Sequence, residues 1–197
     1  MSNTIDQKLI VIGDEYSGKT CCLKFLTENH FLSTYDPTVF NQISKEILIK
    51  NEDGTGNDLT VNLNIWDTAG QNNFDNLRQL AYKDSNIVLL FFSIDNPSSF
   101  KNISKRWIPE LVSNLESNLI SNIPILIVGC KKDLRDSISR NGYDDNSPEY
   151  FDLFFKKLAK DNSNLNIISY TECSSLTGEN IDKLFYQATI QSLNSNK

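Results

Sequence analysis

The chain has 197 residues, of which 39% are hydrophobic. This length and composition predict one domain with a buried core and need no second domain. The formal net charge of -6 argues against a nucleic-acid backbone or an anionic membrane surface as partner, because both would be repelled overall.

The chain ends and the cysteines favour a cytoplasmic protein with no membrane anchor of its own. The start, Met1 to Asp6, lacks a basic region followed by an apolar core, and the tail from Leu193 to Lys197 lacks a C-a-a-X box and a basic cluster. The four cysteines form no C-x-x-C pair, so we expect free thiols packed in or near the core. They are Cys21, Cys22, Cys130 and Cys173.

The first elements predict a strand, a loop and a helix. The strand covers residues 8–12 and the helix residues 19–28, and the intervening sequence completes the pattern G-x-x-x-x-G-K-[ST] over residues 13–20. Such a loop presents successive backbone N–H groups and a helix N-terminus to a polyphosphate. In this pattern Lys19 reaches the β and γ phosphates and the Thr20 hydroxyl completes a Mg²⁺ shell.

The next apolar runs predict a sheet. Residues 59–65 alternate apolar and polar side chains, as a half-buried strand does, and residues 43–49 would pair with them across a long hairpin tip at 51–58. Residues 87–92 and 123–128 are continuous apolar runs, which are typical of central parallel strands covered on both faces. The expected fold class is α/β, with a mostly parallel central sheet.

Helical patterns separate these strands and predict helices on both faces of the sheet. One helix begins with Asn96 as cap and Pro97 in its first turn. Its apolar stripe is Phe100, Ile103, Trp107, Leu111 and Leu115, and further stripes fall in 150–158 and 181–188. Strands joined by crossover helices predict a doubly wound sheet with its ligand at the carboxyl ends of the strands.

A second motif, residues 66–71, follows the alternating strand. The Asp67 carboxylate could hold Mg²⁺ through water, and Gly70 permits close approach of the backbone to a terminal phosphate. Gln71 carries both a donor and an acceptor with which to orient an attacking water. Taken alone, this hexapeptide would be interpreted as a strand end with a turn.

A third motif, residues 130–133, follows the last central strand. The Asp133 carboxylate would accept two hydrogen bonds from guanine, which adenine cannot donate, and the stem of Lys131 would pack on the base plane. Backbone N–H groups at Ser174 and Ser175 could donate to guanine O6. Taken alone, Lys131 to Asp133 would be a solvated surface turn.

With these three motifs the chain resembles the Ras superfamily of small GTPases, which are P-loop NTPases, over almost its whole length. Residues 31–40 resemble the first switch, where Phe31 packs beside guanine and Thr38 binds Mg²⁺ only when the γ-phosphate is present. Residues 74–82 resemble the second switch. The Rho/Rac branch is favoured by Ser98 to Phe100, by Trp107 to Glu110 and by a long segment over 135–151 that matches the Rho insert.

The resemblance implies a monomeric switch that binds GTP and GDP with Mg²⁺, hydrolyses GTP and responds to exchange factors. Effectors would contact Tyr35 to Ile43 and Phe74 to Tyr82, although Asn41 replaces the usual aspartate. Gln71, Lys19 and Thr38 would be catalytic, and Thr20 and Thr38 would hold the metal. The nucleotide would be bound by Gly13, Asp14, Glu15, Tyr16, Ser17, Gly18, Lys19, Thr20, Cys21, Phe31, Thr38, Asp67, Thr68, Ala69, Gly70, Gln71, Cys130, Lys131, Lys132, Asp133, Ser174 and Ser175.

The main departure from the family is Glu15, at a position that usually holds glycine. An activating protein inserts an arginine past that glycine, a contribution of about 10³ to 10⁵ in rate, and Glu15 would obstruct it. We therefore predict slow hydrolysis and a poor response to Rho-type activating proteins. Three alternatives stay open: a tolerated surface substitution, a binding module that stays loaded with GTP, and a P-loop kinase that shares only the first motif.

Overall fold

The computed structural model describes residues 4–31, 37–51, 58–115, 121–137 and 146–194. Their strands form one six-stranded sheet in the order β2-β3-β1-β4-β5-β6. β2 and β3 are antiparallel and the other neighbours are parallel, which confirms the expected mostly parallel sheet. The strands are β1 (Thr4–Gly13), β2 (Phe40–Ile49), β3 (Leu59–Thr68), β4 (Ile87–Ser93), β5 (Pro124–Cys130) and β6 (Asn166–Glu172).

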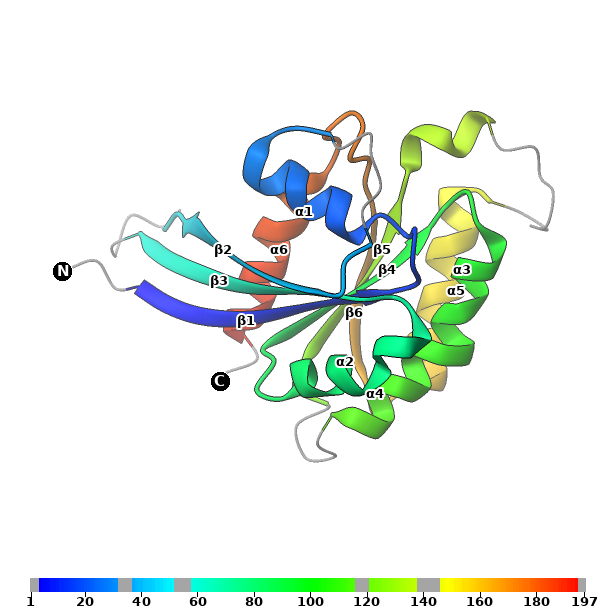
Figure 1. Cartoon of the computed structure of the whole chain (residues 1–197), viewed down its shortest axis with the longest axis horizontal. Coiled ribbons are helices and arrows are strands. Elements are labelled where there is room, and N and C mark those ends of the chain that lie inside the picture. The colour runs from blue at the N-terminus through cyan, green and yellow to red at the C-terminus, as the bar shows by residue number, and fades with distance from the viewer. Residues whose placement is uncertain (1–3, 32–36, 52–57, 116–120, 138–145, 195–197) are drawn as a thin grey trace.

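Helices cover both faces of the sheet, as expected (Figure 1). On one face lie α1 (Lys19–Glu28) and α6 (Ile181–Asn194). On the other lie α2 (Asp75–Tyr82), α3 (Pro97–Asn102), α4 (Ile108–Asn114) and α5 (Pro148–Asp161). Among the described residues, no helix is both long and apolar enough to cross a membrane.

The core is divided between these two faces by the alternation of side chains along the strands. Leu9 and Val11 of β1 pack with residues of α1 and α6, whereas Ile10 and Ile12 pack with residues of α2 to α5. The second cluster includes an aromatic group around Phe92, whose ring contacts Phe100, Phe151, Phe155 and Tyr170. Both faces therefore hold the strands, and their carboxyl ends, in fixed positions.

Several strands are longer than the apolar runs predicted. β1 begins at Thr4 rather than Lys8, and β3 continues to Thr68, so that Asp67 lies within the strand and not after it. The reason is backbone pairing, which places Asp67 opposite Val11 on one side and Asn41 on the other. Ladder hydrogen bonds do not depend on side-chain polarity, so the strand continues through polar residues.

The helix predicted to follow β4 begins as expected but is not continuous. The Asn96 side chain accepts hydrogen bonds from the backbone of Ser98 and Ser99, at 2.9 and 3.3 Å. A π-helical turn at Ile103–Trp107 then separates α3 from α4, with the Ile108 N–H donating to the carbonyl of Ile103. The next residue, Pro109, has no N–H to donate, which disfavours a regular α-helical pattern there.

Parts of four expected segments lie outside the described residues. These parts are 32–36 of the first switch, 52–57 of the hairpin tip, 138–145 of the insert and 195–197 of the tail. The borders of the insert are described: a 3₁₀ turn covers Lys132–Ser137, and α5 begins after Ser147, whose side chain accepts from the Tyr150 N–H at 3.2 Å.

Candidate functional site

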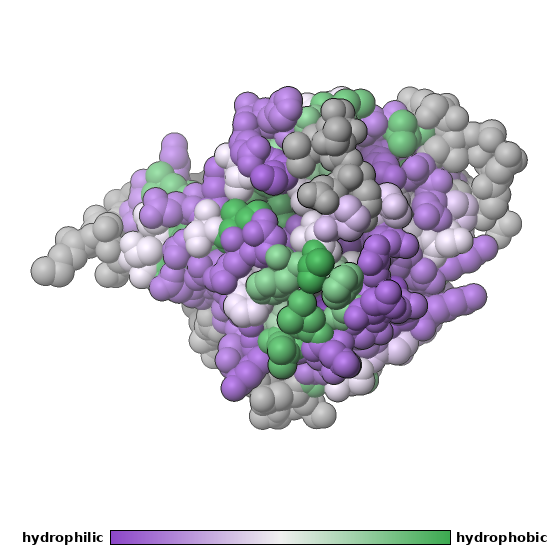
Figure 2. Space-filling model, viewed as in Figure 1, coloured by the Kyte–Doolittle hydropathy of each residue, from purple (hydrophilic) through white to green (hydrophobic). Residues whose placement is uncertain are grey.

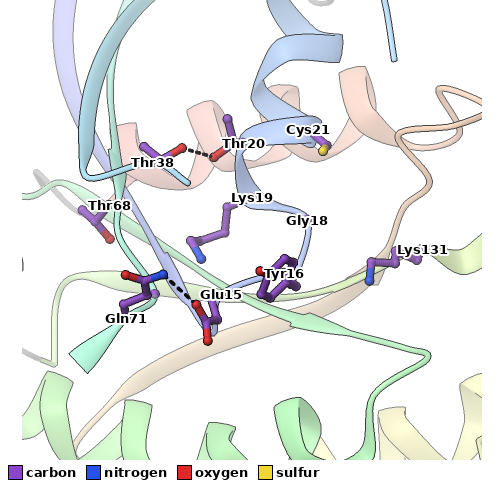
Figure 3. A pocket seen from close by; sticks show the side chains of 11 residues that line it. Glu15, Tyr16, Gly18, Lys19, Thr20, Cys21, Thr38, Thr68, Gln71 and Lys131 are labelled. Carbon is purple, nitrogen blue, oxygen red and sulfur yellow. Dashed lines mark hydrogen bonds between the residues drawn. The ribbon is translucent and has the colours of Figure 1, made fainter. Parts of the chain in front are cut away.

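The sequence motifs meet at the carboxyl ends of the strands. The glycine-rich loop (residues 13–18) follows β1, while residues 66–71 lie at the end of β3 and residues 130–133 at the end of β5. A cavity of about 160 Å³ opens among them (Figure 3). It is lined by Glu15, Tyr16, Gly18, Lys19, Thr20, Cys21, Thr38, Thr68, Gly70, Gln71 and Lys131.

Gly70 allows two of these motifs to lie in contact. A Cβ atom added at Gly70 would stand 2.2 Å from the Glu15 nitrogen and 2.4 Å from the Asp14 carbonyl carbon. Real Cβ atoms do not approach backbone this closely. Only glycine therefore lets residue 70 pack against the glycine-rich loop.

Lys19 lies buried beneath the glycine-rich loop. Its ammonium donates to the carbonyls of Gly13 and Asp14, at 2.8 and 2.7 Å. Burial lowers the pKa of Lys19 to about 8, and the negative charges of Asp67 and Asp14 oppose that shift only in part. A charged lysine here thus lacks a full counter-charge, and an anion in the cavity would supply one.

Asp67, Thr20 and Thr38 form a cluster of hard oxygen atoms. The Thr20 hydroxyl donates to Asp67 Oδ2 at 2.7 Å, and its oxygen lies 2.8 Å from that of Thr38. Burial raises the pKa of Asp67, against the hydrogen bond from Thr20. Asp67 Oδ1 is buried and has no partner among the described residues. This oxygen set, with one unsatisfied carboxylate atom, fits a magnesium ion.

Glu15 and Gln71 are joined directly across the mouth of the cavity. The Gln71 side-chain amide donates to Glu15 Oε2 at 2.9 Å, as the dashed line in Figure 3 shows. The two residues are 56 positions apart in the chain. The amide that was predicted to orient a water molecule is thus held by the residue that departs from the family pattern.

The loops after β5 and β6 are joined at the other end of the site. The Ser174 hydroxyl donates to Asp133, and the Lys132 N–H donates to the Cys173 carbonyl at 3.1 Å. Lys131 pairs with Asp95 at 3.3 Å. Cys130 lies under the glycine-rich loop, since a Cβ atom at Gly18 would be 3.0 Å from its Cβ.

The thiols are free in the structure, as predicted. Cys22, Cys130 and Cys173 are buried, and Cys21 is partly buried. The sulfur atoms of Cys130 and Cys173 are 3.6 Å apart.

Not every predicted site residue lines the small cavity. Asp14 is turned away from it, because its carboxylate accepts from Asn102 and from the Trp107 indole, at 2.7 and 2.8 Å. Ser17 and Ala69 are buried within their loops. The other predicted residues outside the lining are Gly13, Phe31, Asp67, Cys130, Lys132, Asp133, Ser174 and Ser175.

Sequence analysis missed the residues that attach the segment after β3 to the helices. Arg106 donates to the Gly70 carbonyl at 3.1 Å, and its guanidinium lies 4.3 Å from the Trp107 ring centroid. Arg78 is buried and donates to both oxygens of Glu110, at 2.6 and 2.9 Å. Burial opposes its charge, but hydrogen bonds to Glu110 and Asp75 outweigh that and raise the pKa of Arg78. The one available signal was Trp107 to Glu110, used above only as a mark of the Rho/Rac branch.

An apolar surface lies beside the cavity. Figure 2, drawn in the view of Figure 1, shows hydrophobic side chains gathered near the middle of the face that is turned toward the reader. Exposed apolar residues at the start of β2, just before it and on α2 include Val39, Phe40, Leu77 and Leu80, of which Leu80 is 71% exposed. Single exposed apolar residues are common, but a contiguous group of them marks an interaction surface.

The mostly parallel six-stranded sheet, covered by helices on both faces and carrying the glycine-rich loop after its first strand, defines a Ras-like G domain. The family model described as Ras family matches residues 8–194. The chain is also 35% identical over 196 residues to the GTP-binding protein RHO1 of Saccharomyces cerevisiae, a match that covers 98% of this chain and 86% of RHO1. This chain belongs to the Ras family of small GTPases.

Proposed function

We propose that this chain is a Rho-type GTP-binding switch in intracellular signalling, which hydrolyses GTP slowly. The observation that carries the proposal is the meeting of three separate motifs around one cavity at the strand ends. The similarity to RHO1 supports the Rho branch. The glycine-rich loop and Lys19 would bind the phosphates, and Asp133, Lys131 and Ser174 would bind the guanine.

Magnesium fits the same proposal. Thr20 and Thr38 would hold the ion, and Asp67 would bind it through water, which would satisfy the buried Oδ1 atom. When bound, Mg²⁺ neutralises charge on the β and γ phosphates. Since Thr38 lies within the effector segment, loss of the γ-phosphate would release that segment from the site.

The slow hydrolysis is supported by the hydrogen bond from Gln71 to Glu15. Gln71 orients an attacking water only when its side-chain amide is available, and here that amide donates to the Glu15 carboxylate at 2.9 Å. Glu15 also brings negative charge toward the γ-phosphate. Two unit charges about 5 Å apart repel by about 3 kcal/mol at an effective dielectric near 20, and less where solvent screens them.

The test is single-turnover GTP hydrolysis, with and without a Rho-type activating protein. We expect slow turnover and little acceleration for the natural chain, and acceleration of about 10³-fold or more for Glu15→Gly. Glu28→Gly is the matched control, since it makes the same replacement at an exposed carboxylate that does not line the cavity. Strong acceleration of the natural chain would refute the proposed insensitivity.

A second candidate is a binding module that never hydrolyses its GTP, which the same hydrogen bond favours. Chromatography of the nucleotide that co-purifies distinguishes the two. Mainly GDP indicates a working hydrolase, and mainly GTP indicates the module. Phosphoryl transfer to an acceptor, without release of phosphate, would instead indicate the P-loop kinase.

The apolar surface of Val39, Phe40, Leu77 and Leu80 is the proposed contact for effectors, and exchange factors would act on the same switch segments. Asn41, exposed at the start of β2, carries no charge there, so effectors that recognise an anion at this position would bind poorly. We propose that the chain acts as a monomer.

A further inference from the structure

A buried ion pair lies behind the loop that is proposed to read the guanine base. Arg135 belongs to the 3₁₀ turn Lys132–Ser137, and its guanidinium donates to the Glu172 carboxylate. The side chains of Arg135 and Glu172 are only 13% and 8% exposed. Because Glu172 is the last residue of β6, the pair joins the loop after β5 to the loop after β6.

Stability alone does not account for this ion pair. Burial removes both charges from water, and their attraction offsets that cost only where further hydrogen bonds satisfy the remaining N–H groups. Here Nε and Nη1 of Arg135 are buried and have no hydrogen-bond partner among the described residues. Such a pair is often no more stabilising than apolar side chains of the same size. What the pair does fix is the position of the two loops that it joins.

Buried aromatic side chains hold both members of the pair. The Arg135 guanidinium lies 5.5 Å from the centroid of the Phe151 ring, which is fully buried in α5 and packs against the Phe92 ring of β4. On the other side, the Tyr170 hydroxyl donates to the Glu172 carboxylate. The two charged groups are thus placed by the core of the domain, and the two loops are placed with them.

Two of the residues that would bind guanine stand close to this pair. Asp133 comes two residues before Arg135, and Ser174 comes two residues after Glu172. The Ser174 hydroxyl donates to the Asp133 carboxylate, so the distance between the two loops decides whether both can reach one base. The ion pair sets that distance from the side of the core, with side chains that do not line the cavity.

We infer that Arg135 and Glu172 are positioning residues, which hold Asp133 and Ser174 at the spacing that guanine requires. The inference rests on the proposed nucleotide binding and deepens it, because it concerns how the base is selected. Neither Arg135 nor Glu172 would touch the nucleotide. Their effect would be seen in the preference among bases and in the rate of nucleotide release, and not in the chemistry at the γ-phosphate.

The test compares the dissociation rates of fluorescent GDP and fluorescent inosine diphosphate, each displaced by excess GDP in the presence of Mg²⁺. Inosine lacks the 2-amino group that would donate to Asp133, so GDP should leave the natural chain about tenfold more slowly than inosine diphosphate. In the double variant Arg135→Met with Glu172→Met, GDP should leave about tenfold faster, and the ratio of the two rates should fall to about 3. Arg135→Lys, which keeps the charge but loses the planar guanidinium, should give an intermediate ratio.

Glu179→Gln is the matched control. The Glu179 carboxylate pairs with Lys132 and so joins the same two loops, but these two side chains are 48% and 34% exposed. Because pairs this exposed contribute little, both dissociation rates should change by less than about twofold. The double variant, free of nucleotide, should melt within about 3 °C of the natural chain, since apolar side chains can replace a buried pair without net cost.

The ratio of the two rates separates a positioning role from a merely structural one. If both nucleotides leave the double variant faster by the same factor, the pair stabilises the fold and the inference is wrong. If neither rate changes, the inference is also wrong, and the proposed nucleotide binding stands. Should the double variant fail to fold, the same ratio measured with Arg135→Lys gives the answer. If the natural chain binds no GDP at micromolar concentration, the proposed function itself fails.

Discussion

Removal of the Glu110 carboxylate should destabilise the fold strongly. Arg78 is 0% exposed in its side chain and Glu110 14%, and the Tyr82 hydroxyl also donates to Glu110, at 2.6 Å. Glu110→Ala would leave a buried guanidinium with half of its carboxylate partners. Breaking a buried pair in this way costs about 3 to 5 kcal/mol, which is a large part of a typical stability of about 5 to 15 kcal/mol.

Urea unfolding of the nucleotide-free protein measures this cost. In thermal unfolding, the melting temperature of Glu110→Ala should be about 10 °C lower than that of the natural chain. Glu28→Ala is the matched control, because it removes an exposed carboxylate that pairs with Lys24 at 2.8 Å, and such pairs contribute about 0.5 kcal/mol or less. Glu110→Gln keeps one acceptor, so its free energy of unfolding should lie between those of Glu110→Ala and Glu28→Ala. If Glu110→Ala and Glu28→Ala unfold at the same urea concentration, the pair with Arg78 does not hold α2 in place.

Three further predictions concern the site. Burial lowers the pKa of Lys19 to about 8, and a bound phosphate would raise it again. Nucleotide binding should therefore take up about 0.9 proton at pH 9 but only about 0.1 proton at pH 7. Calorimetry in two buffers of different ionisation enthalpy measures this uptake. Asp133→Asn should shift the preference from guanine toward xanthine in competition binding, and an unchanged preference would exclude Asp133 as the base-reading residue. Trp107→Phe removes the donor to Asp14 and should cost about 1 to 3 kcal/mol in urea unfolding, against less than about 1 kcal/mol for Trp66→Phe.

The sequence predicted what depends on short patterns. The apolar run before the glycine-rich loop, the alternation in β3 and the Asn96 cap are all local signals, and the elements they predict are present. Their boundaries were less accurate, because β3 extends through Asp67 by pairing with β1 and β2. That pairing is set by residues more than 20 positions away, and no local pattern reports it.

The contacts within the site were predicted only in part. The sequence identified Glu15 as an obstruction, but it could not show that the carboxylate accepts a hydrogen bond from Gln71, since that depends on the side-chain conformations of two loops. It also could not show that the Asp14 carboxylate accepts from the Trp107 indole, which lies 93 positions away in the chain. A charged residue in a loop has many potential partners, and only the fold selects among them.

The attachments around Trp107 limit which part of the site can change. Asp14 before the cavity is fixed by the Trp107 indole, and Gly70 after β3 is fixed by Arg106, whose guanidinium packs on the same ring. Both loops are therefore fastened to one buried side chain in the π-helical turn. The Glu15 carboxylate and the Gln71 amide meet outside these attachments, in a hydrogen bond exposed to solvent, where a net contribution is only about 1 kcal/mol. The contact that holds Gln71 is thus weaker than the contacts that position the loops, so a partner able to bind Glu15 could free Gln71 without disturbing the rest of the site.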